Sequence, residues 1–306
     1  MTTPTSTTPG PTPGPTLGPP PGAGPAPAPS VHVEAQVLGS RSVGAYRHVT
    51  VVAPGVPERF RPGTSVAVGL PGGARLARRS YWIHGVRPVG AHGPALQLVV
   101  EPSGTAGSWL AGLREGARLE LTGPLGRPFA LPKEPVSCLL VGEDWSAAPL
   151  LPLAERLRER GCAVTMLVAA QDEAHLVSAL DARRAARAVT VATADGSVGR
   201  RGGAADVVAE VLERSQAEVV YAAGPAATLH AVAAAAEDHG AWSQTAVTVP
   251  QPCATGLCHG CPVPVVGEDG VARTVRACTE GPVLRGDRVR WADLRAVDGA
   301  RPGAPA

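Results

Sequence analysis

The sequence predicts a multi-domain β plus α/β protein. A six-stranded antiparallel β-barrel is expected first, then a doubly wound parallel α/β domain and a C-terminal cysteine module. Three observations predict this class. Short runs of alternating apolar residues occupy the first third of the chain, apolar runs alternate with amphipathic or alanine-rich stretches in the middle, and four cysteines gather near the end. A period of two residues indicates strands, whereas strand–helix alternation is typical of a parallel sheet.

Length and charge narrow the classes of function. A chain of 306 residues has room for two domains or slightly more. Its 28 basic and 26 acidic residues leave a formal net charge of +2, so neither nucleic acid nor an anionic membrane is indicated as a partner. No apolar run approaches the length of a membrane span, and the N-terminal residues show no signal-peptide pattern. We therefore expect a cytoplasmic protein with reduced thiols.

Shifts in composition divide the chain into five segments. The first and last are rich in proline, glycine and alanine, and they bury too little apolar surface to fold by themselves. The expected segments are a disordered tail (1–30), the β-barrel (31–131), the α/β domain (135–250), the cysteine module (251–295) and a flexible tail (296–306).

Six strands are expected in the barrel, separated by turns such as Pro54-Gly55 and Pro71-Gly72-Gly73. One helix is expected before the last strand, over residues 105–114, with Thr105 as its cap and an anion site at its first turn. The expected strands are 31–37, 46–52, 64–70, 80–86, 95–101 and 117–122.

The α/β segment is expected to alternate strands and helices. Gly161 should end the first helix, and Pro225 should lie in the first turn of the last one. The expected strands are 136–141, 163–169, 189–193 and 219–223, and the expected helices lie near 146–160, 172–180, 204–214 and 225–238.

The cysteine spacing is the most specific signal in the chain. Cys253, Cys258 and Cys261 form C-x4-C-x2-C, and Cys278 follows after sixteen residues. This is the plant-type spacing of a [2Fe–2S] cluster held by four thiolates. Three sulfurs from one loop must converge on one small cluster, so the backbone has to wrap around it. The four cysteines are therefore the candidate metal ligands.

Neighbouring residues refine this prediction. Gly256 and Gly260 are expected to supply the positive φ angles that such a loop requires. Cys138 and Cys162 lie in apolar runs and are expected to be small buried hydrophobes. His259 is expected to be an exposed loop residue, because Rieske-type centres use two histidines. A structural zinc site of four thiolates remains the alternative.

Two longer motifs carry a resemblance to a known family. The cysteine triplet is followed by C-T-E-G-P-V-L at residues 278–284, and G-T-A-G-S-W-L begins a segment that ends in G-P-L-G at residues 104–126. Over residues 31–291 the chain resembles the electron-transfer subunit of NAD-linked dihydroorotate dehydrogenase, a group within the ferredoxin-reductase superfamily. The resemblance implies a ferredoxin-reductase-like fold with FAD in the barrel and the cluster close to the flavin.

The resemblance also implies which residues bind FAD. The segment A-R-R-S-Y-W-I at residues 77–83 falls where the family carries its flavin-binding strand. An arginine there suits a bidentate contact with the flavin pyrophosphate, and a tyrosine suits packing on the flavin. Tryptophan stands where the family has serine or threonine after the tyrosine. The implied binding residues are Arg79, Ser80, Tyr81, Trp82, Gly104 and Thr105.

One departure from the family concerns NAD. After the first strand of the α/β segment, the family has a glycine-rich loop, which lets a pyrophosphate approach the backbone. This chain has V-G-E-D-W-S-A-A-P-L at residues 141–150, so Glu143, Asp144 and Trp145 follow the first glycine. Ala223 also replaces a family cysteine. Two carboxylates repel phosphate, so we expect the fold to be kept and NAD to be reduced poorly, if it binds.

Three functions remain open. The first is an electron-transfer flavo-iron–sulfur subunit in pyrimidine biosynthesis, with a dihydroorotate dehydrogenase-type catalytic partner that docks near the cluster cysteines. The resemblance implies a heterotetramer, by analogy. The second is a stand-alone ferredoxin-reductase-like oxidoreductase for another redox partner. The third is a non-catalytic scaffold with a four-cysteine zinc site. No side chain is assigned as a catalytic acid, base or nucleophile.

Overall fold

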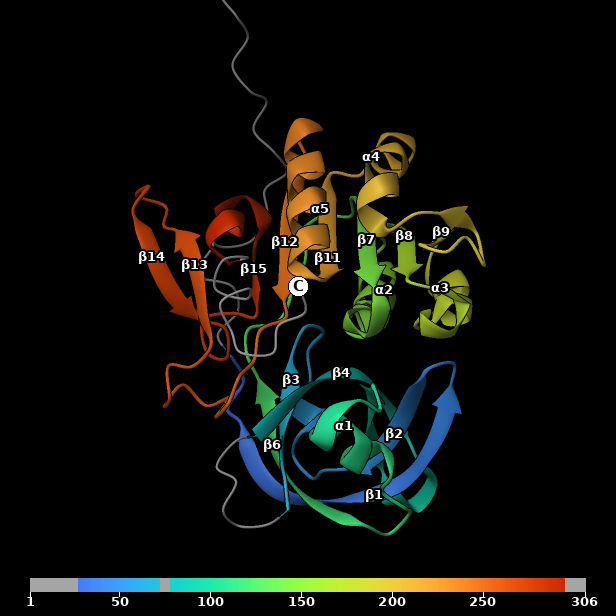
Figure 1. Cartoon of the computed structure of the whole chain (residues 1–306), viewed down its shortest axis with the longest axis vertical. Coiled ribbons are helices and arrows are strands. Elements are labelled where there is room, and N and C mark those ends of the chain that lie inside the picture. Colours follow the sequence, from blue (N-terminus) through green and yellow to red (C-terminus); the bar gives the residue numbers. More distant parts are fainter. Residues whose placement is uncertain (1–26, 72–77, 295–306) are drawn as a thin grey trace, which may run out of the picture.

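Six antiparallel strands close into the predicted barrel in the computed structural model, which describes residues 27–71 and 78–294 (Figure 1). The strand order is β1-β2-β5-β4-β3-β6, and the apolar side chains of alternate positions fill the barrel interior. The helix α1 (Gly104–Ala111) lies between the last two strands. The strands are β1 (Val31–Val43), β2 (Tyr46–Val52), β3 (Ser65–Gly69), β4 (Arg78–Pro88), β5 (Pro94–Val100) and β6 (Arg118–Leu125).

The α/β part is built on a seven-stranded sheet of order β10-β9-β8-β7-β11-β12-β15. All neighbouring strands are parallel except β15, which pairs antiparallel with β12. The strands are β7 (Ser137–Glu143), β8 (Ala163–Ala170), β9 (Ala188–Thr193), β10 (Arg200–Arg201), β11 (Val219–Gly224), β12 (Trp242–Val247) and β15 (Val283–Arg285). The helices are α2 (Leu150–Glu159), α3 (Ala179–Ala185), α4 (Ala204–Ser215) and α5 (Ala226–Asp238).

The two faces of this sheet pack against different parts of the molecule. The face covered by α2 and α3 shares one apolar cluster with Tyr46, Trp82 and Val99 of the barrel. The face covered by α4 and α5 shares another with Cys261 and Cys278. Figure 1 shows the barrel below the sheet and the hairpin of β13 (Pro262–Val266) and β14 (Ala272–Arg276) beside it. One core layer thus joins the barrel to the sheet, and the other joins the cysteine module to it.

The fold class is as predicted, but the starts of three helices differ from expectation. The first begins at Gly104 with Ser103 as its N-cap and no side-chain cap bond, so Thr105 does not cap it. The helix expected over 146–160 is a 3-10 turn (Asp144–Ala147) followed by α2, with Pro149 at the helix N-cap. Pro225 is also an N-cap residue rather than part of the first turn, and Gly161 follows the end of α2 with φ 80° as expected.

The helix expected over 172–180 is wrong. The side chain of Asp172 accepts a hydrogen bond from the His175 backbone N–H at 3.0 Å, which closes a 3-10 turn (Glu173–His175). The chain then runs through Val177, which is buried, and α3 starts only after Ser178, a left-handed residue with φ 55°. The residue pattern of this stretch indicated one continuous helix. It could not show that the chain breaks the helix to bury Val177 in the core.

Parts of the earlier expectations fall outside the described residues. The turn at Gly72-Gly73, most of the N-terminal tail and the C-terminal tail are among them. The remaining 3-10 turns are Pro57–Arg59, Gly90–His92 and Gly286–Arg288. In the part of the chain that the structure describes, no helix is both long and apolar enough to cross a membrane.

Candidate flavin and iron–sulfur sites

The cluster loop runs from Pro252 to Cys261 and lies against the barrel. Ala254 is fully buried and packs with Ala67 and Leu125 of strands β3 and β6. The fourth cysteine, Cys278, follows strand β14 and is 3% exposed. The backbone N–H of Ala277 donates to the carbonyl of Cys261 at 2.9 Å, so the segment that carries the fourth cysteine is joined directly to the loop.

The turns of this loop differ in part from the expectation. Gly256 has φ 86°, and a side chain there would meet Thr279. Gly260 is not left-handed; the other positive φ angles fall on Ala254 (φ 58°) and His259 (φ 53°). A small residue tolerates this backbone more easily than a bulky one, and the burial of Ala254 against the barrel fixes its conformation. His259 is exposed, as expected.

Backbone N–H groups of the loop point at its sulfur atoms. The N–H groups of Thr255 and Cys258 lie 3.4 Å from the Cys253 sulfur, and the Gly260 N–H lies 3.3 Å from the Cys258 sulfur. Burial acts to raise the pKa of the Cys253 thiol, but these two N–H donors lower that pKa to about 6. Donors placed in this way stabilise thiolates, the form that binds metal.

The other two cysteines form a close pair. The sulfur atoms of Cys261 and Cys278 lie 3.4 Å apart, and both residues are buried. Burial and the neighbouring Cys261 sulfur raise the pKa of the Cys278 thiol to about 12, so a bound cation is needed to hold Cys278 as a thiolate. The described residues include no group of three or more His, Cys, Asp or Glu side chains that could hold one metal ion. Paired thiolates suit a cluster with two irons, in which each iron takes two protein ligands.

Two adjoining cavities lie between the barrel and the α/β part. Their volumes are about 280 and 190 Å³, and both are lined by Arg79, Ser80, Tyr81 and Trp145. The first extends along residues 247–252 and the second along the first turn of α1. An elongated ligand such as a dinucleotide suits two cavities that share a wall.

Unpaired polar atoms in the first cavity favour a polar ligand. Ser65 Oγ and Thr248 Oγ1 are buried and have no hydrogen-bond partner among the described residues, and both residues line this cavity. Buried hydroxyl groups are nearly always hydrogen-bonded, so these two atoms are suited to meet groups of a bound molecule. Gly104, with φ 60°, has open space where a side chain would be, so nothing crowds the start of α1.

The structure brings all six predicted flavin residues to these cavities. Tyr81 is buried in the barrel core cluster and faces both cavities, and burial raises its pKa to about 12. Trp82 lines the first cavity and packs against the core of the α/β part. Gly104 and Thr105 line the second. Ser65, Thr248 and Trp145 also line these cavities, and the sequence did not predict this placement, because only tertiary packing brings them to one wall.

Strand β4, which carries the predicted flavin residues, is hydrogen-bonded to the cluster loop. The backbone N–H of Arg78, the residue before Arg79, donates to the carbonyl of Pro252 at 2.7 Å. Ser80 Oγ lies 3.4 Å from the side-chain oxygen of Gln251. Pro252 lines the first cavity and directly precedes Cys253. A ligand in this cavity therefore lies beside the loop that carries three of the four cysteines.

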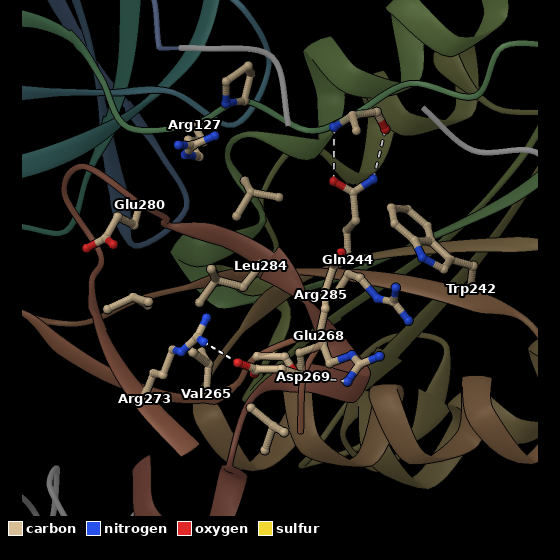
Figure 2. A pocket seen from close by; sticks show the side chains of 17 residues that line it. Arg127, Trp242, Gln244, Val265, Glu268, Asp269, Arg273, Glu280, Leu284 and Arg285 are labelled. Carbon is tan, nitrogen blue, oxygen red and sulfur yellow. Dashed lines mark hydrogen bonds and ion pairs between the residues drawn. The ribbon is translucent and has the colours of Figure 1, made fainter. Parts of the chain in front are cut away.

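A larger cavity than these two lies elsewhere. It has a volume of about 480 Å³ and lies between the β13–β14 hairpin, strands β12 and β15, and residues 127–130 (Figure 2). The Gln244 amide bonds both backbone groups of Ala130, at 2.9 and 2.8 Å, and Arg273 is paired with Asp269. None of the predicted flavin or cluster residues lines it.

Replacing Arg79 with alanine is expected to weaken FAD binding by about ten- to a hundredfold, because a charge-assisted bond contributes about 1.5–3 kcal/mol. The measurement is a titration of the FAD-free protein with FAD, followed by flavin fluorescence. Arg87→Ala is the matched control: Arg87 lies on the same strand, pairs with Glu155 and does not line either cavity. Equal FAD affinity in Arg79→Ala and the wild type would contradict the assignment.

Comparison with known proteins places this arrangement in a family. Residues 252–290 match the model of the iron-sulfur cluster binding domain of dihydroorotate dehydrogenase B. The match confirms the prediction of an iron–sulfur module in this part of the chain.

Two solved structures share the fold. One, of an NADH-dependent reduced ferredoxin-NADP oxidoreductase, has a TM-score of 0.75 at 24% identity and covers 86% of this chain and 92% of that one. The ferredoxin reductase of carbazole 1,9a-dioxygenase has a TM-score of 0.59 at 23% identity, with 70% and 67% covered.

Curated relatives extend the likeness to most of the chain. A probable dihydroorotate dehydrogenase B (NAD(+)) electron transfer subunit of Methanopyrus kandleri is 27% identical over 87% of this chain and 94% of its own length. Electron transfer subunits of the same enzyme are 31% identical in Listeria monocytogenes, over 58% of this chain and 68% of the relative, and 31% identical in Shouchella clausii, over 61% and 71%. The chain therefore belongs to the family of dihydroorotate dehydrogenase B electron transfer subunits.

Proposed function

We propose that this chain is a flavo-iron–sulfur subunit in the cytoplasm. It passes electrons between a dihydroorotate dehydrogenase-type catalytic partner and NAD or another acceptor, as part of pyrimidine biosynthesis. The observation that carries the proposal is the continuous wall between the first flavin cavity and the cluster loop, where Pro252 lines the cavity and Cys253 follows. Electron transfer between two bound groups requires them to be close, and this wall supports that requirement.

The residues of this chain bind and orient the two groups. Arg79 and the first-turn N–H groups of α1 are suited to the phosphates of FAD, since helix N-termini attract anions. Cys253, Cys258, Cys261 and Cys278 hold the [2Fe–2S] cluster. When bound, FAD exchanges electrons singly or in pairs, whereas the cluster carries one at a time. The chain also has to hold FAD and the cluster close to each other and close to the catalytic partner.

An exposed apolar side chain supports partner docking at the cluster. Leu257, in the cluster loop, is 82% exposed. Cys258 is also exposed, beside Leu257. Exposed apolar side chains near a redox centre suit a protein interface, where large apolar groups are enriched. A heterotetramer with two catalytic subunits is proposed by analogy with the family.

The test is coexpression with the catalytic subunit, followed by gel filtration and by electron transfer from dihydroorotate to the flavin. Leu257→Asp is expected to lower the affinity of the complex by about tenfold or more, because it buries a charge in an apolar interface. Its iron, sulfide and flavin contents should stay at wild-type levels. Leu180→Asp is the control, since Leu180 is 75% exposed on α3 and does not belong to the cluster module.

The competing functions give different results in the same experiment. A wild-type chain that holds iron and flavin but never joins the catalytic subunit would favour a stand-alone reductase. A colourless chain that holds zinc, with neither flavin nor acid-labile sulfide, would favour the scaffold and overturn the proposal.

A further inference from the structure

Glu143 lies at the place where open parallel sheets bind ligands. It is the last residue of β7, which pairs with β8 on one side and β11 on the other. The chain leaves β7 through α2 on one face of the sheet and enters β11 from α4 on the other face. The carboxyl end of β7 is therefore the topological switch point of the sheet, and dinucleotides bind in the crevice at such a point.

The Glu143 carboxylate points to the beginnings of two helices. It accepts a hydrogen bond from the hydroxyl of Thr228, a buried residue in the first turn of α5. Burial raises the pKa of the Glu143 carboxyl, and the nearby backbone N–H of Ala204, the first residue of α4, acts against that rise. Helix N-termini attract anions through their free N–H groups and their dipoles. The negative charge near the starts of α4 and α5 in this crevice is thus the Glu143 side chain and not a ligand.

Close packing shows that little room is left around this carboxylate. A side chain added at Gly203 would lie 3.1 Å from a Glu143 oxygen, and one added at Gly224 would lie 3.4 Å from the Glu143 Cβ. Glycines at such positions normally leave space for a phosphate to approach the backbone. Here Glu143 occupies the space that these two glycines leave open.

The next two residues extend the obstruction in two directions. Asp144 takes a left-handed backbone, with φ 50°, and its carboxylate accepts a hydrogen bond from the Gln171 N–H at 3.3 Å, just after strand β8. Trp145 lines both flavin cavities. Three consecutive side chains therefore reach toward the helix starts, the end of β8 and the flavin cavities.

We propose that Glu143, Asp144 and Trp145 form an internal plug that excludes pyridine dinucleotides from this chain, with the Glu143 carboxylate in the place of a bound pyrophosphate. The inference rests on the proposed function and narrows it, because NAD is then not the acceptor. A bound pyrophosphate would meet two carboxylates within a few ångströms, and like charges this close repel strongly in a crevice of low dielectric. The flavin exchanges electrons with carriers that do not need this crevice.

The test uses the full chain as purified, with its bound groups, and ADP-ribose as the probe. ADP-ribose contains the pyrophosphate of NAD but transfers no hydride, so calorimetry reports binding independently of activity. The wild type is expected to show no measurable binding. Glu143→Gly with Asp144→Gly should bind ADP-ribose more tightly by about a hundredfold or more, because it removes both charges and opens the crevice. Glycine also suits the left-handed backbone of residue 144.

Two further variants complete the design. Glu143→Gln keeps the size of the side chain and can still bond Thr228, so it isolates the charge and should give an intermediate gain. It also decides the question if the double variant does not fold. Glu173→Gln removes an exposed carboxylate near the same edge of the sheet, outside the crevice, and should bind no better than the wild type.

The outcomes separate the plug from the proposed function. Wild-type binding of ADP-ribose in the micromolar range, or rapid anaerobic bleaching of the flavin by low concentrations of NADH, would overturn the plug. So would an absence of gain in both Glu143 variants. Flavin and iron analyses on the same wild-type sample test the proposed function instead, because a sample without either group would overturn that function whatever the calorimetry shows.

Discussion

Replacing Cys278 with serine is expected to remove most of the iron and acid-labile sulfide from the purified chain, together with its visible cluster absorption. Cys278 is buried and its sulfur lies 3.4 Å from that of Cys261, so the two thiols form one pair of ligands and the variant removes half of it. A serine oxygen is a harder and less acidic ligand than a thiol, and buried surroundings oppose its ionisation further. The measurement is an anaerobic spectrum with iron, sulfide and zinc analysis.

The chain offers two matched controls for this variant. Cys138 and Cys162 are also buried, but they lie in the apolar core of the α/β part. Cys138→Ala and Cys162→Ala should each keep the cluster and lose only about 1–2 kcal/mol of stability through the small cavity that they leave. Full iron in Cys278→Ser, or equal iron loss in the two controls, would contradict the assigned ligand set. Zinc without sulfide in the wild type would support the four-thiolate zinc site instead.

Replacing Gly107 with alanine is expected to destabilise the barrel by about 3 kcal/mol and to release the flavin. A Cβ at this position would lie 2.2 Å from the carbonyl oxygen of Glu101, which is backbone and cannot move without shifting α1 or β5. Gly107 and Glu101 both line the second of the two cavities assigned to FAD in the proposal, so the same shift would displace the N–H groups at the start of α1. Stability and FAD binding should therefore fall together.

The measurements for this variant are the free energy of unfolding in denaturant and the flavin retained after gel filtration. Gly39→Ala is the control, because Gly39 lies on strand β1 of the same barrel and a Cβ there would meet nothing within 4 Å. Unchanged stability and flavin content in Gly107→Ala would show that α1 can shift freely, which would contradict a tight contact between Gly107 and the Glu101 carbonyl.

Prediction from sequence was most successful where a pattern is set by neighbours along the chain. The six barrel strands follow from alternation of apolar residues, and the cysteine triplet follows from the reach of one short loop. Prediction failed for β12, whose central residues Ser243, Gln244 and Thr245 are polar yet buried. Their burial depends on partners far along the chain, such as Ala130, which the Gln244 amide bonds. A period of apolar residues cannot reveal a strand of this kind.

The positive φ angles of the cluster loop show the same limit. Glycine was expected to mark them, and Gly256 does, but Ala254 and His259 take the other two. Ala254 adopts its conformation because its side chain is enclosed between barrel strands β3 and β6. A left-handed residue other than glycine costs about 1–2 kcal/mol, which the contacts of the folded loop must offset.

The sequence by itself determined the class of the protein, the order of its parts and the four cysteines, because local periodicity and ligand spacing are properties of the covalent chain. It also marked Glu143 and Asp144 as departures from a glycine-rich loop. Only the tertiary structure decided what these carboxylates contact. The hydroxyl that Glu143 binds belongs to Thr228, 85 residues further along the chain, and it reaches Glu143 because β7 and β11 are neighbours in the sheet. Spatial proximity across a parallel sheet depends on strand order, which a linear pattern does not contain.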